Sequence, residues 1–228
     1  MDLELQGKVA IVTGGSKGIG KAIALELAKE GVDVAIASRS KGPLEETAKE
    51  LSKETGRRII PIVADMTSWD DVQNMVETTV STLGKVDILV NNAGLFKGAP
   101  LHEISDDQYD EMMNINMKAV FQLTRRVLPV MMEQKGGNII HISSILGIIA
   151  VPQVAAYNIS KGALNQFSRS IAVEYGSYGI RSNAICPGLV DTERTDFIAA
   201  ADGRVQFLPH EMSVHKFHEL SPETTTAC

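Results

Sequence analysis

The sequence lacks the features that mark several classes of protein. Its two cysteines, Cys186 and Cys228, are too few for a disulfide framework, so we expect a reducing, cytoplasmic environment. No apolar run is long enough to span a bilayer, and the first residues carry neither the basic nor the apolar region of a secretory signal. With a net charge of -6, the chain also lacks the basic excess of nucleic-acid-binding proteins. We therefore expect a globular protein that binds neither a membrane nor a nucleic acid.

What the sequence does have is a regular alternation of short apolar runs with longer segments of helical periodicity. The runs are rich in Val and Ile on both faces, which is typical of buried strands in a parallel sheet. The predicted strands are Val9–Val12, Val32–Ala37, Ile59–Val63, Val86–Val90, Asn138–Ile142 and Ile180–Ile185. The predicted helices are Ile19–Glu30, Leu44–Thr55, Trp69–Leu83, Asp107–Glu133 and Ala155–Tyr178. This alternation predicts an α/β fold, a three-layer doubly wound parallel sheet. For a Rossmann-like sheet of this kind we expect the strand order 3-2-1-4-5-6.

The regular pattern stops near Thr192. We interpret residues 1–192 as one dinucleotide-binding and catalytic domain, and residues 193–228 as an atypical tail that is partly disordered. The tail contains three histidines, but their spacing is loose and no cysteine accompanies them, so we expect no metal site. These histidines are His210, His215 and His218.

A glycine-rich turn follows the first predicted strand and opens the first predicted helix. This context suits a dinucleotide, because the helix N-terminus offers free N–H groups to a pyrophosphate. Gly14 would allow the tight turn, Gly18 the close approach of the backbone to the pyrophosphate, and Gly20 the packing of helix on strand. The alternative is a structural turn that binds no ligand. The predicted cofactor residues of this turn are Gly14, Ser16, Lys17, Gly18, Ile19 and Gly20.

The residues after the second predicted strand indicate which nicotinamide would bind. A site that prefers NAD usually has an acidic residue there, which binds the ribose hydroxyls. Here Ser38 and Arg39 take that place, and Lys17 adds a second cation within the glycine turn. A 2′-phosphate would meet two positive charges and no carboxylate, so NADP(H) is favoured over NAD(H). The alternative is that both cations are simply solvated surface residues.

Tyr157 and Lys161 are four residues apart at the start of a helical segment and so share one face. An ammonium about 5 Å from a phenol, at an effective dielectric of about 20, favours the phenolate by about 3 kcal/mol, or roughly 2.4 pKa units. Ser144 follows a predicted strand, where ligands of such sheets bind, and its hydroxyl could hold a substrate oxygen. A Tyr-x3-Lys pair alone is commonly structural. Combined with Ser144 and the glycine turn, it predicts hydride transfer between a nicotinamide and an alcohol or carbonyl.

These residues together give the sequence its resemblance to the short-chain dehydrogenase/reductase family, from about Leu5 to Thr192. The shared motifs are Thr13-Gly14-x3-Gly18-x-Gly20, Asp65, Asn91-Asn92-Ala93-Gly94, Asn116, Ser144, Tyr157-x3-Lys161 and Pro187-Gly188. The sequence is similar both to members of the 3-oxoacyl-(acyl carrier protein) reductase type and to those of the carbonyl reductase type. The resemblance implies an NADP(H)-dependent oxidoreductase that interconverts a ketone or aldehyde and the corresponding secondary or primary alcohol.

The resemblance also assigns roles to individual residues. Tyr157 would be the general acid and base, and Lys161 would lower its pKa and hold the nicotinamide ribose. Ser144 would position the carbonyl, and Asn116 would anchor a water relay to Lys161. The predicted substrate contacts are Ser144, Leu146, Gln153 and Tyr157, with Ile148, Val151 and Leu189 as further apolar neighbours. The predicted cofactor site is completed by Asp65, Met66, Asn91, Ala93, Gly94, Tyr157, Lys161, Pro187, Gly188, Val190 and Thr192.

The chain departs from the family after Thr192. Family members continue with a substrate lid, another helix and a last strand, which here look missing or altered, so that strand Ile180–Ile185 would become a sheet edge. This departure supports an alternative hypothesis, a catalytically weak cofactor-binding or sensor protein. The resemblance further implies a homodimer through the helices 107–133 and 155–178, and possibly a tetramer.

Overall fold

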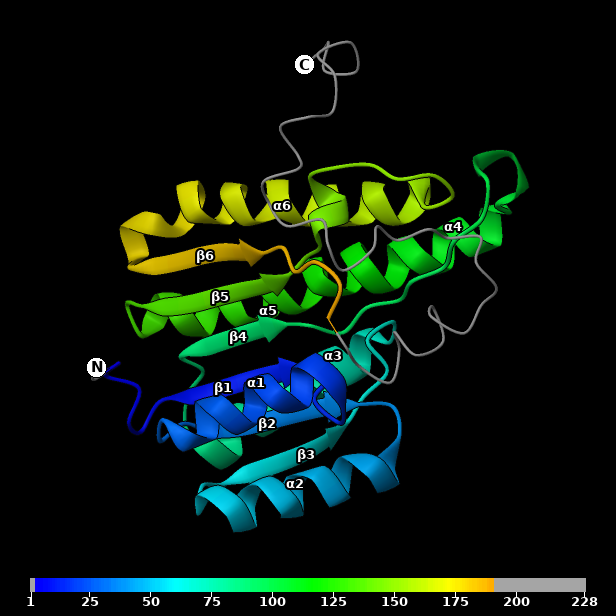
Figure 1. The fold of residues 1–228 in the computed structure, drawn as a ribbon. Coiled ribbons are helices and arrows are strands. Elements are labelled where there is room, and N and C mark those ends of the chain that lie inside the picture. Colours follow the sequence, from blue (N-terminus) through cyan, green and yellow to red (C-terminus); the bar gives the residue numbers. More distant parts are fainter. Residues whose placement is uncertain (1–2, 191–228) are drawn as a thin grey trace, which may run out of the picture. The chain divides into compact units, whose positions relative to one another are not determined.

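A six-stranded parallel sheet organises residues 3–190, the part of the chain that the computed structural model describes. The strands lie in the order β3-β2-β1-β4-β5-β6 (Figure 1), which confirms the predicted order. Their bounds are β1 Val9–Thr13, β2 Asp33–Ser38, β3 Ile59–Val63, β4 Ile88–Asn91, β5 Gly137–Ile142 and β6 Ile180–Ile185. The strand predictions were therefore correct to within about two residues at each end.

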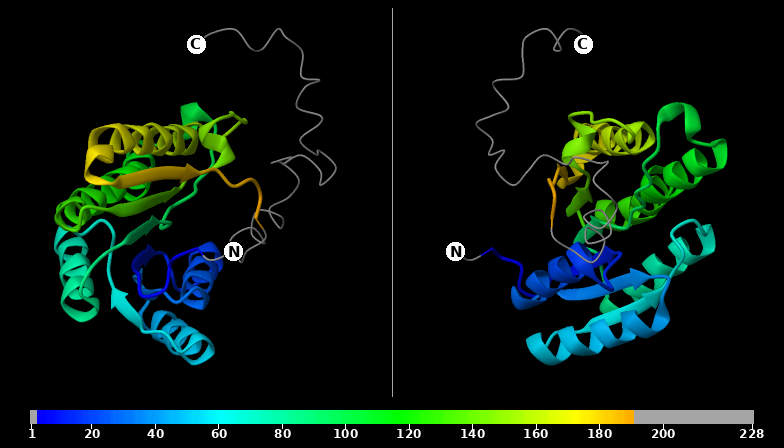
Figure 2. Two further views of the ribbon diagram at one scale, coloured as in Figure 1. Left: turned by 90° about the vertical axis from the view of Figure 1, so that its left-hand side faces the viewer. Right: turned by 45° about the vertical axis from the view of Figure 1, so that its right-hand side comes forward.

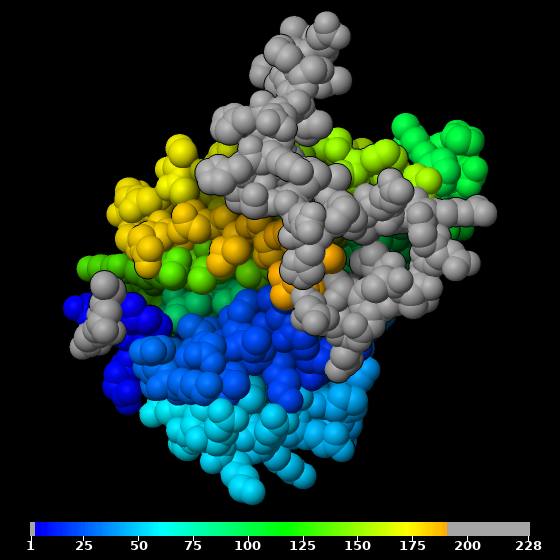
Figure 3. Space-filling view, viewed as in Figure 1, coloured from blue at the N-terminus to red at the C-terminus, as the bar shows by residue number. Residues whose placement is uncertain are grey.

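Helices cover the sheet on both faces, as a parallel sheet requires. The main helices are α1 Gly18–Lys29, α2 Lys41–Thr55, α3 Trp69–Leu83, α4 Asp106–Met113, α5 Ala119–Glu133 and α6 Ala155–Tyr175. Figure 2 shows α1 and α2 on one side of the sheet and α3 and α5 on the other, and Figure 3 shows α1 and α2 forming a continuous surface over their side. The three-layer α/β fold is thus confirmed.

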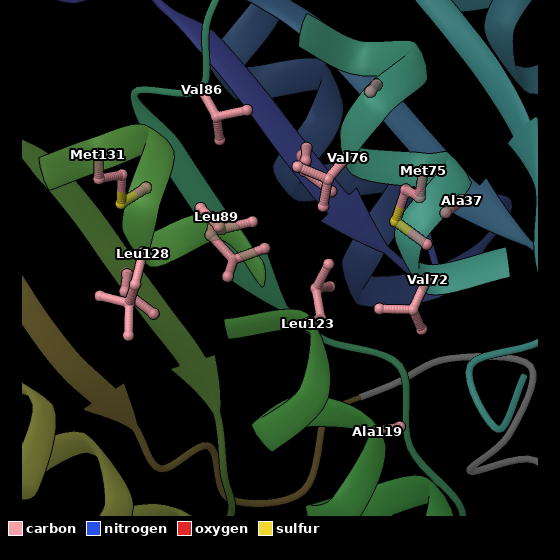
Figure 4. Packing of buried hydrophobic residues seen from close by; sticks show 14 of the residues in the cluster. Ala37, Val72, Met75, Val76, Val86, Leu89, Ala119, Leu123, Leu128 and Met131 are labelled. Atoms are coloured by element: carbon pink, nitrogen blue, oxygen red, sulfur yellow. The ribbon is translucent and has the colours of Figure 1, made fainter. Parts of the chain in front are cut away.

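Each face of the sheet has its own core. Under α1 and α2 the core includes Ala24, Leu44 and Leu51, all fully buried. On the opposite face α3 packs on α5, with Met75 and Val76 of one helix beside Leu123 of the other (Figure 4). Gly56 and Gly84 end α2 and α3 with φ of 68° and 91°, the left-handed conformation that glycine adopts most readily.

One predicted helix is interrupted in the structure. The sequence predicts a single helix over Asp107–Glu133, but α4 and α5 are separated by a π-helical segment, Asn114–Lys118. Hydrophobic periodicity does not reveal this wider turn, because the flanking residues keep helical spacing. Such segments are rare and often occur at functional sites. The buried residue of this segment, Asn116, belongs to the candidate site.

The chain divides into a compact unit, Met1–Leu189, and a second unit, Val190–Cys228, nearly all of which lies outside the described residues. Three predictions concern residues outside the described range: the partly disordered tail, the missing last strand, and the absence of a metal site at His210, His215 and His218. Within residues 3–190, β6 has a neighbouring strand only on its β5 side. In that same range, no helix combines the length and apolar character that crossing a membrane requires.

An ion-pair cluster ties the start of β2 to the segment before β3. The Asp33 side chain is 7% exposed and lies 2.7 Å from Nη2 of Arg57 and 2.6 Å from Nη2 of Arg58. Burial raises the pKa of Asp33, but hydrogen bonds from Arg58 and the charges of both arginines outweigh burial, and the net pKa falls below the ordinary 3.8. The folded state therefore favours the ionised form of Asp33.

We expect Asp33→Asn to lower the free energy of unfolding at pH 7 by about 1–3 kcal/mol, because a charge-assisted cluster is lost. Since the folded-state pKa is lowered, this stabilisation is present above about pH 4 and is lost as pH falls through the lower folded-state value. Urea unfolding at neutral and acidic pH measures both effects. Asp110→Asn, an exposed position on α4, is the matched control. If the wild type and Asp33→Asn lost the same free energy of unfolding between neutral and acidic pH, ionised Asp33 would not be the source of this stabilisation.

Candidate functional site

The residues selected from the sequence gather at one edge of the sheet, where the carboxyl ends of the central strands meet (Figure 1). The glycine turn follows β1, Asn91 ends β4, and Ser144 follows β5. Tyr157 and Lys161 lie in the first turns of α6. In doubly wound sheets this edge, where the strand order reverses, is the usual place for ligands.

The glycine turn has the backbone geometry that its sequence requires. Gly14 and Gly18 have φ of 68° and 54°, in the left-handed region. The Gly14 N–H donates to the carbonyl of Ala37 at the end of β2 (2.8 Å), so the turn is held against the neighbouring strand. Lys17, the N-cap residue of α1, makes no side-chain capping hydrogen bond. A lysine side chain has only donors and so cannot accept the first N–H groups of α1, the groups to which a phosphate would bind.

Asn92 fastens this turn to the end of β4. Its Nδ2 donates to the carbonyl of Thr13 (2.9 Å), and the Thr13 hydroxyl accepts the N–H groups of Asn92 and Ala93 (both 3.0 Å). A Cβ on Gly20 would lie 2.5 Å from Asn92 Nδ2 and would collide with the Gly14 carbonyl. Gly20 therefore makes room for the turn that follows β1 and for Asn92. The cofactor residues predicted from the sequence did not include Asn92, although it stands within the Asn91-Asn92-Ala93-Gly94 motif.

The preceding residue, Asn91, directs its side chain into the interior. Its Nδ2 donates to the Thr124 hydroxyl (3.2 Å) and lies 3.2 Å from Nδ1 of His141. Asn91 is 2% exposed, so its side chain is taken up by these interior contacts. Burial lowers the pKa of His141 to about 4, and the charge of Lys161 contributes. His141 is therefore neutral at pH 7 and adds no second positive charge beside Lys161.

Three of the cofactor residues predicted beyond the glycine turn, Ser38, Arg39 and Asp65, lie at or just after the ends of β2 and β3. Ser38 is half-buried, and Arg39 and Lys17 are exposed. The Asp65 carboxylate accepts the backbone N–H (2.8 Å) and the hydroxyl (2.7 Å) of Thr67. These hydrogen bonds lower the pKa of Asp65, and the nearby charge of Arg39 adds to the effect. Arg39 thus lies within electrostatic reach of Asp65.

Lys161 is held deep in the site. It is 4% exposed, and its Nζ donates to the carbonyl of Ile142 (2.8 Å). The same ammonium lies 5.7 Å from the ring centroid of Tyr157, so the structure brings the predicted pair together. The hydroxyl of Ser143 donates to the Lys161 carbonyl (3.0 Å), which joins α6 to the end of β5.

Asn116 links the loop after β4 to α6. Its Oδ1 accepts the N–H of Leu95 (2.6 Å), and its Nδ2 donates to the Leu95 carbonyl (2.8 Å) and to the Ser160 hydroxyl (3.0 Å). A Cβ on Gly94 would lie 3.3 Å from Asn116 Oδ1 and 3.6 Å from Lys161 Nζ. Gly94 therefore borders the space between these two side chains. Asn116 lies in this position as the buried residue of the π-helical segment.

The substrate residues differ in how accessible they are. Ser144 Oγ accepts the N–H of Leu146 (3.1 Å), which leaves its own proton free for an acceptor. Leu146 is only 8% exposed, whereas Ile148 is 69% exposed. Gln153 is exposed and has a positive φ of 65°, which is uncommon for a residue other than glycine. The substrate contact predicted for Leu146 thus falls on a mostly buried side chain.

The remaining predicted residues follow β3 and β6. Met66 is buried, at 9% exposure. The Pro187 carbonyl accepts the N–H of Ile145 (2.9 Å), which fixes the segment after β6 beside Ser144. Gly188 and Leu189 are exposed. Val190 is the first residue of the second unit, and Thr192 lies outside the described residues.

Known proteins share both this sequence pattern and this fold. The family model of the short chain dehydrogenases matches residues 8–202. The 3-oxoacyl-[acyl-carrier-protein] reductase of Thermotoga maritima is 36% identical over 194 residues, which are 85% of this chain and 78% of that protein. The L-sorbose reductase of Gluconobacter frateurii, solved with NADPH and L-sorbose, superposes with a TM-score of 0.84 at 35% identity, covering 89% of this chain and 79% of that one. A xylitol dehydrogenase bound to NAD+ gives a TM-score of 0.79 at 35% identity, with 81% and 71% covered. The chain therefore belongs to the short-chain dehydrogenase/reductase family of oxidoreductases, as its motifs predicted.

Proposed function

We propose that the chain is an NADP(H)-dependent oxidoreductase that interconverts a ketone or aldehyde and the corresponding alcohol, with Tyr157 as general acid and base. The observation that carries this proposal is the buried Lys161 ammonium, 5.7 Å from the Tyr157 ring. A charge is costly to bury in such a place, which is a reason to expect a function for it. The same arrangement argues against a weak cofactor-binding or sensor protein.

Each polar residue has a distinct part in this reaction. The bound nicotinamide would supply or accept the hydride. The Ser144 hydroxyl would donate a hydrogen bond to the carbonyl oxygen, and Tyr157 would give that oxygen its proton on reduction and take it back on oxidation. Lys161 would stabilise the phenolate and bind the ribose, and Asn116 would anchor a water leading to Lys161. The glycine turn and the N-terminus of α1 would hold the pyrophosphate.

The preference for NADP(H) rests on this chain's own residues. Solved relatives include one protein bound to NADPH and one bound to NAD+, so likeness alone does not decide between them. Here β2 ends at Ser38 and is followed by Arg39, with Lys17 across the turn and no carboxylate at the place where NAD enzymes bind the ribose. Arg39 could reach a 2′-phosphate with paired hydrogen bonds.

We expect Arg39→Ala to lower kcat/KM for NADPH by about ten- to a hundredfold, because a hydrogen bond between charged groups is lost. The value for NADH should change little, since NADH lacks the phosphate. Steady-state kinetics with both cofactors measures the ratio of kcat/KM for NADPH to kcat/KM for NADH. Lys41→Ala removes another exposed cation two residues along the chain and is the matched control. An equal fall in kcat/KM for NADH would show that Arg39 does not bind the 2′-phosphate.

The substrate class can be narrowed by direct assay. Oxidation of NADPH and NADH is followed with ketones, 3-oxoacyl thioesters and ketose sugars, the last two being suggested by the names of similar proteins. We expect turnover with NADPH on at least one class. Thermal protection by NADPH without turnover on any class would instead support a cofactor-binding protein.

We also propose that the protein is a homodimer formed through the helices 107–133 and 155–178, with a tetramer as a further possibility. Large apolar side chains are exposed on both helices, with Phe121 at 44% on α5 and Val173 at 87% on α6. Apolar surface of this kind is often buried between subunits. Sedimentation equilibrium with the full chain tests the proposal, and a monomer at micromolar concentration would refute it.

A further inference from the structure

Phe96 packs directly against the proposed catalytic ring. Its ring centroid lies 4.9 Å from that of Tyr157, with the two planes at 78°, an edge-to-face contact. Aromatic pairs favour this geometry because the positive edge of one ring meets the negative face of the other. Phe96 belongs to the loop after β4 and Tyr157 to α6, so the contact joins two elements far apart in the sequence.

The hydrogen bonds of Asn116 place the two rings relative to one another. Its amide bonds both backbone groups of Leu95, the residue before Phe96. The same amide donates to the Ser160 hydroxyl, which in turn donates to the Tyr157 carbonyl (2.8 Å). One buried side chain therefore fixes the backbone next to both rings.

A second close approach involves Gly98, which lies two residues after Phe96 in the same loop. Gly98 lies so near the segment before α6 that a Cβ there would be 3.2 Å from the Gln153 carbonyl oxygen and 3.6 Å from Cγ1 of Val154. That same Cβ would be 3.8 Å from Cζ of Phe96. The loop after β4 thus packs on the segment that leads into Tyr157, and the end of the Phe96 ring lies near this contact.

We propose that Phe96 is a positioning residue, whose ring holds the Tyr157 ring in the orientation that keeps the phenol near Lys161. This proposal rests on the proposed function of Tyr157. A phenylalanine ring cannot exchange a proton or bind the substrate oxygen, so its effect passes through the orientation of Tyr157. Small misplacements of a reacting group are costly, because proton transfer requires hydrogen-bond distance.

The test compares Phe96→Leu, which keeps apolar bulk but removes the ring, with Phe96→Tyr, which keeps the ring. Lys97→Ala, in the same loop, is the control, since Lys97 pairs with the exposed Glu111 and not with Tyr157. We expect Phe96→Leu to lower kcat by about tenfold or more with little change in KM for NADPH, and Phe96→Tyr to stay near the wild type. The pH dependence of alcohol oxidation should move to higher pH in Phe96→Leu only.

A titration without turnover separates this proposal from the proposed function. The chain has four tyrosines, and subtracting the near-ultraviolet titration of Tyr157→Phe isolates the phenol of Tyr157. With NADP+ bound, that phenol should ionise at higher pH in Phe96→Leu than in the wild type. If the titration of Tyr157 shifted in Phe96→Leu but the wild type had no turnover, the positioning role of Phe96 would be supported and the proposed enzymatic function would be refuted. An unchanged titration, or a change confined to the KM of the ketone, would overturn the positioning role.

Discussion

Replacing Tyr157 by Phe is expected to lower kcat by about a hundred- to ten-thousandfold, the usual contribution of a general acid or base. The ring and its contact with Phe96 remain, so the fold and the binding of NADPH should be preserved. Steady-state reduction of the best substrate measures kcat, and thermal protection by NADPH measures binding.

Tyr178→Phe is the matched control for this variant, because Tyr178 is 45% exposed and lies just beyond the far end of α6. It should leave kcat and cofactor binding unchanged. If Tyr157→Phe kept a tenth or more of the wild-type kcat, proton transfer would have to come from another group or from water.

The second large effect is expected for Lys161→Met. Lys161 Nζ lies 5.7 Å from the centroid of the Tyr157 ring. An ammonium about 5 Å from a phenolate oxygen attracts it by about 3 kcal/mol at an effective dielectric of about 20. Losing this attraction raises the pKa of the phenol, so alcohol oxidation at neutral pH should fall by roughly a hundredfold and recover as pH rises. The pH dependence of kcat for alcohol oxidation is the measurement.

Stability must be followed in the same variant. Lys161→Met leaves the Ile142 carbonyl without its hydrogen bond, which costs about 1–3 kcal/mol when that carbonyl stays buried. Thermal unfolding separates this loss from the loss of rate, and Lys53→Met on the exposed side of α2 is the control. An activity that fell equally at every pH would mean that Lys161 acts through binding or folding, not through the charge of the phenol.

The sequence predicted the parts of the site that depend on local spacing. The glycine turn needs glycine at positive φ, and Gly14 and Gly18 adopt that conformation. Tyr157 and Lys161 share a face because four residues make about one helical turn, and the structure places them together. The alternation of apolar runs and helical segments likewise predicted the doubly wound parallel sheet, because right-handed connections between parallel strands leave few topologies.

The contacts between distant segments could not be predicted in this way. Nothing in the spacing of Asn91 and Asn92 tells which side chain faces the glycine turn, since that depends on the orientation of the last residues of β4. Leu146 reads as an apolar residue beside Ser144, yet its burial is decided by the packing of the turn that contains it. The contact of Phe96 with Tyr157 joins residues 61 positions apart, counting 157 − 96, and no local pattern records it.

The π-helical segment between α4 and α5 also sets the rotational phase of one helix relative to the other. An α-helix advances by about 100° per residue, so one extra residue in a single turn rotates α4 by about that angle relative to α5. Asn116 lies in this turn and bonds Leu95 and Ser160. Deleting one residue here would restore regular α-helical winding between α4 and α5, but it would move the Asn116 amide away from Leu95 and Ser160. Apart from Asn116, this stretch should therefore accept changes of its exposed side chains more readily than a change of length.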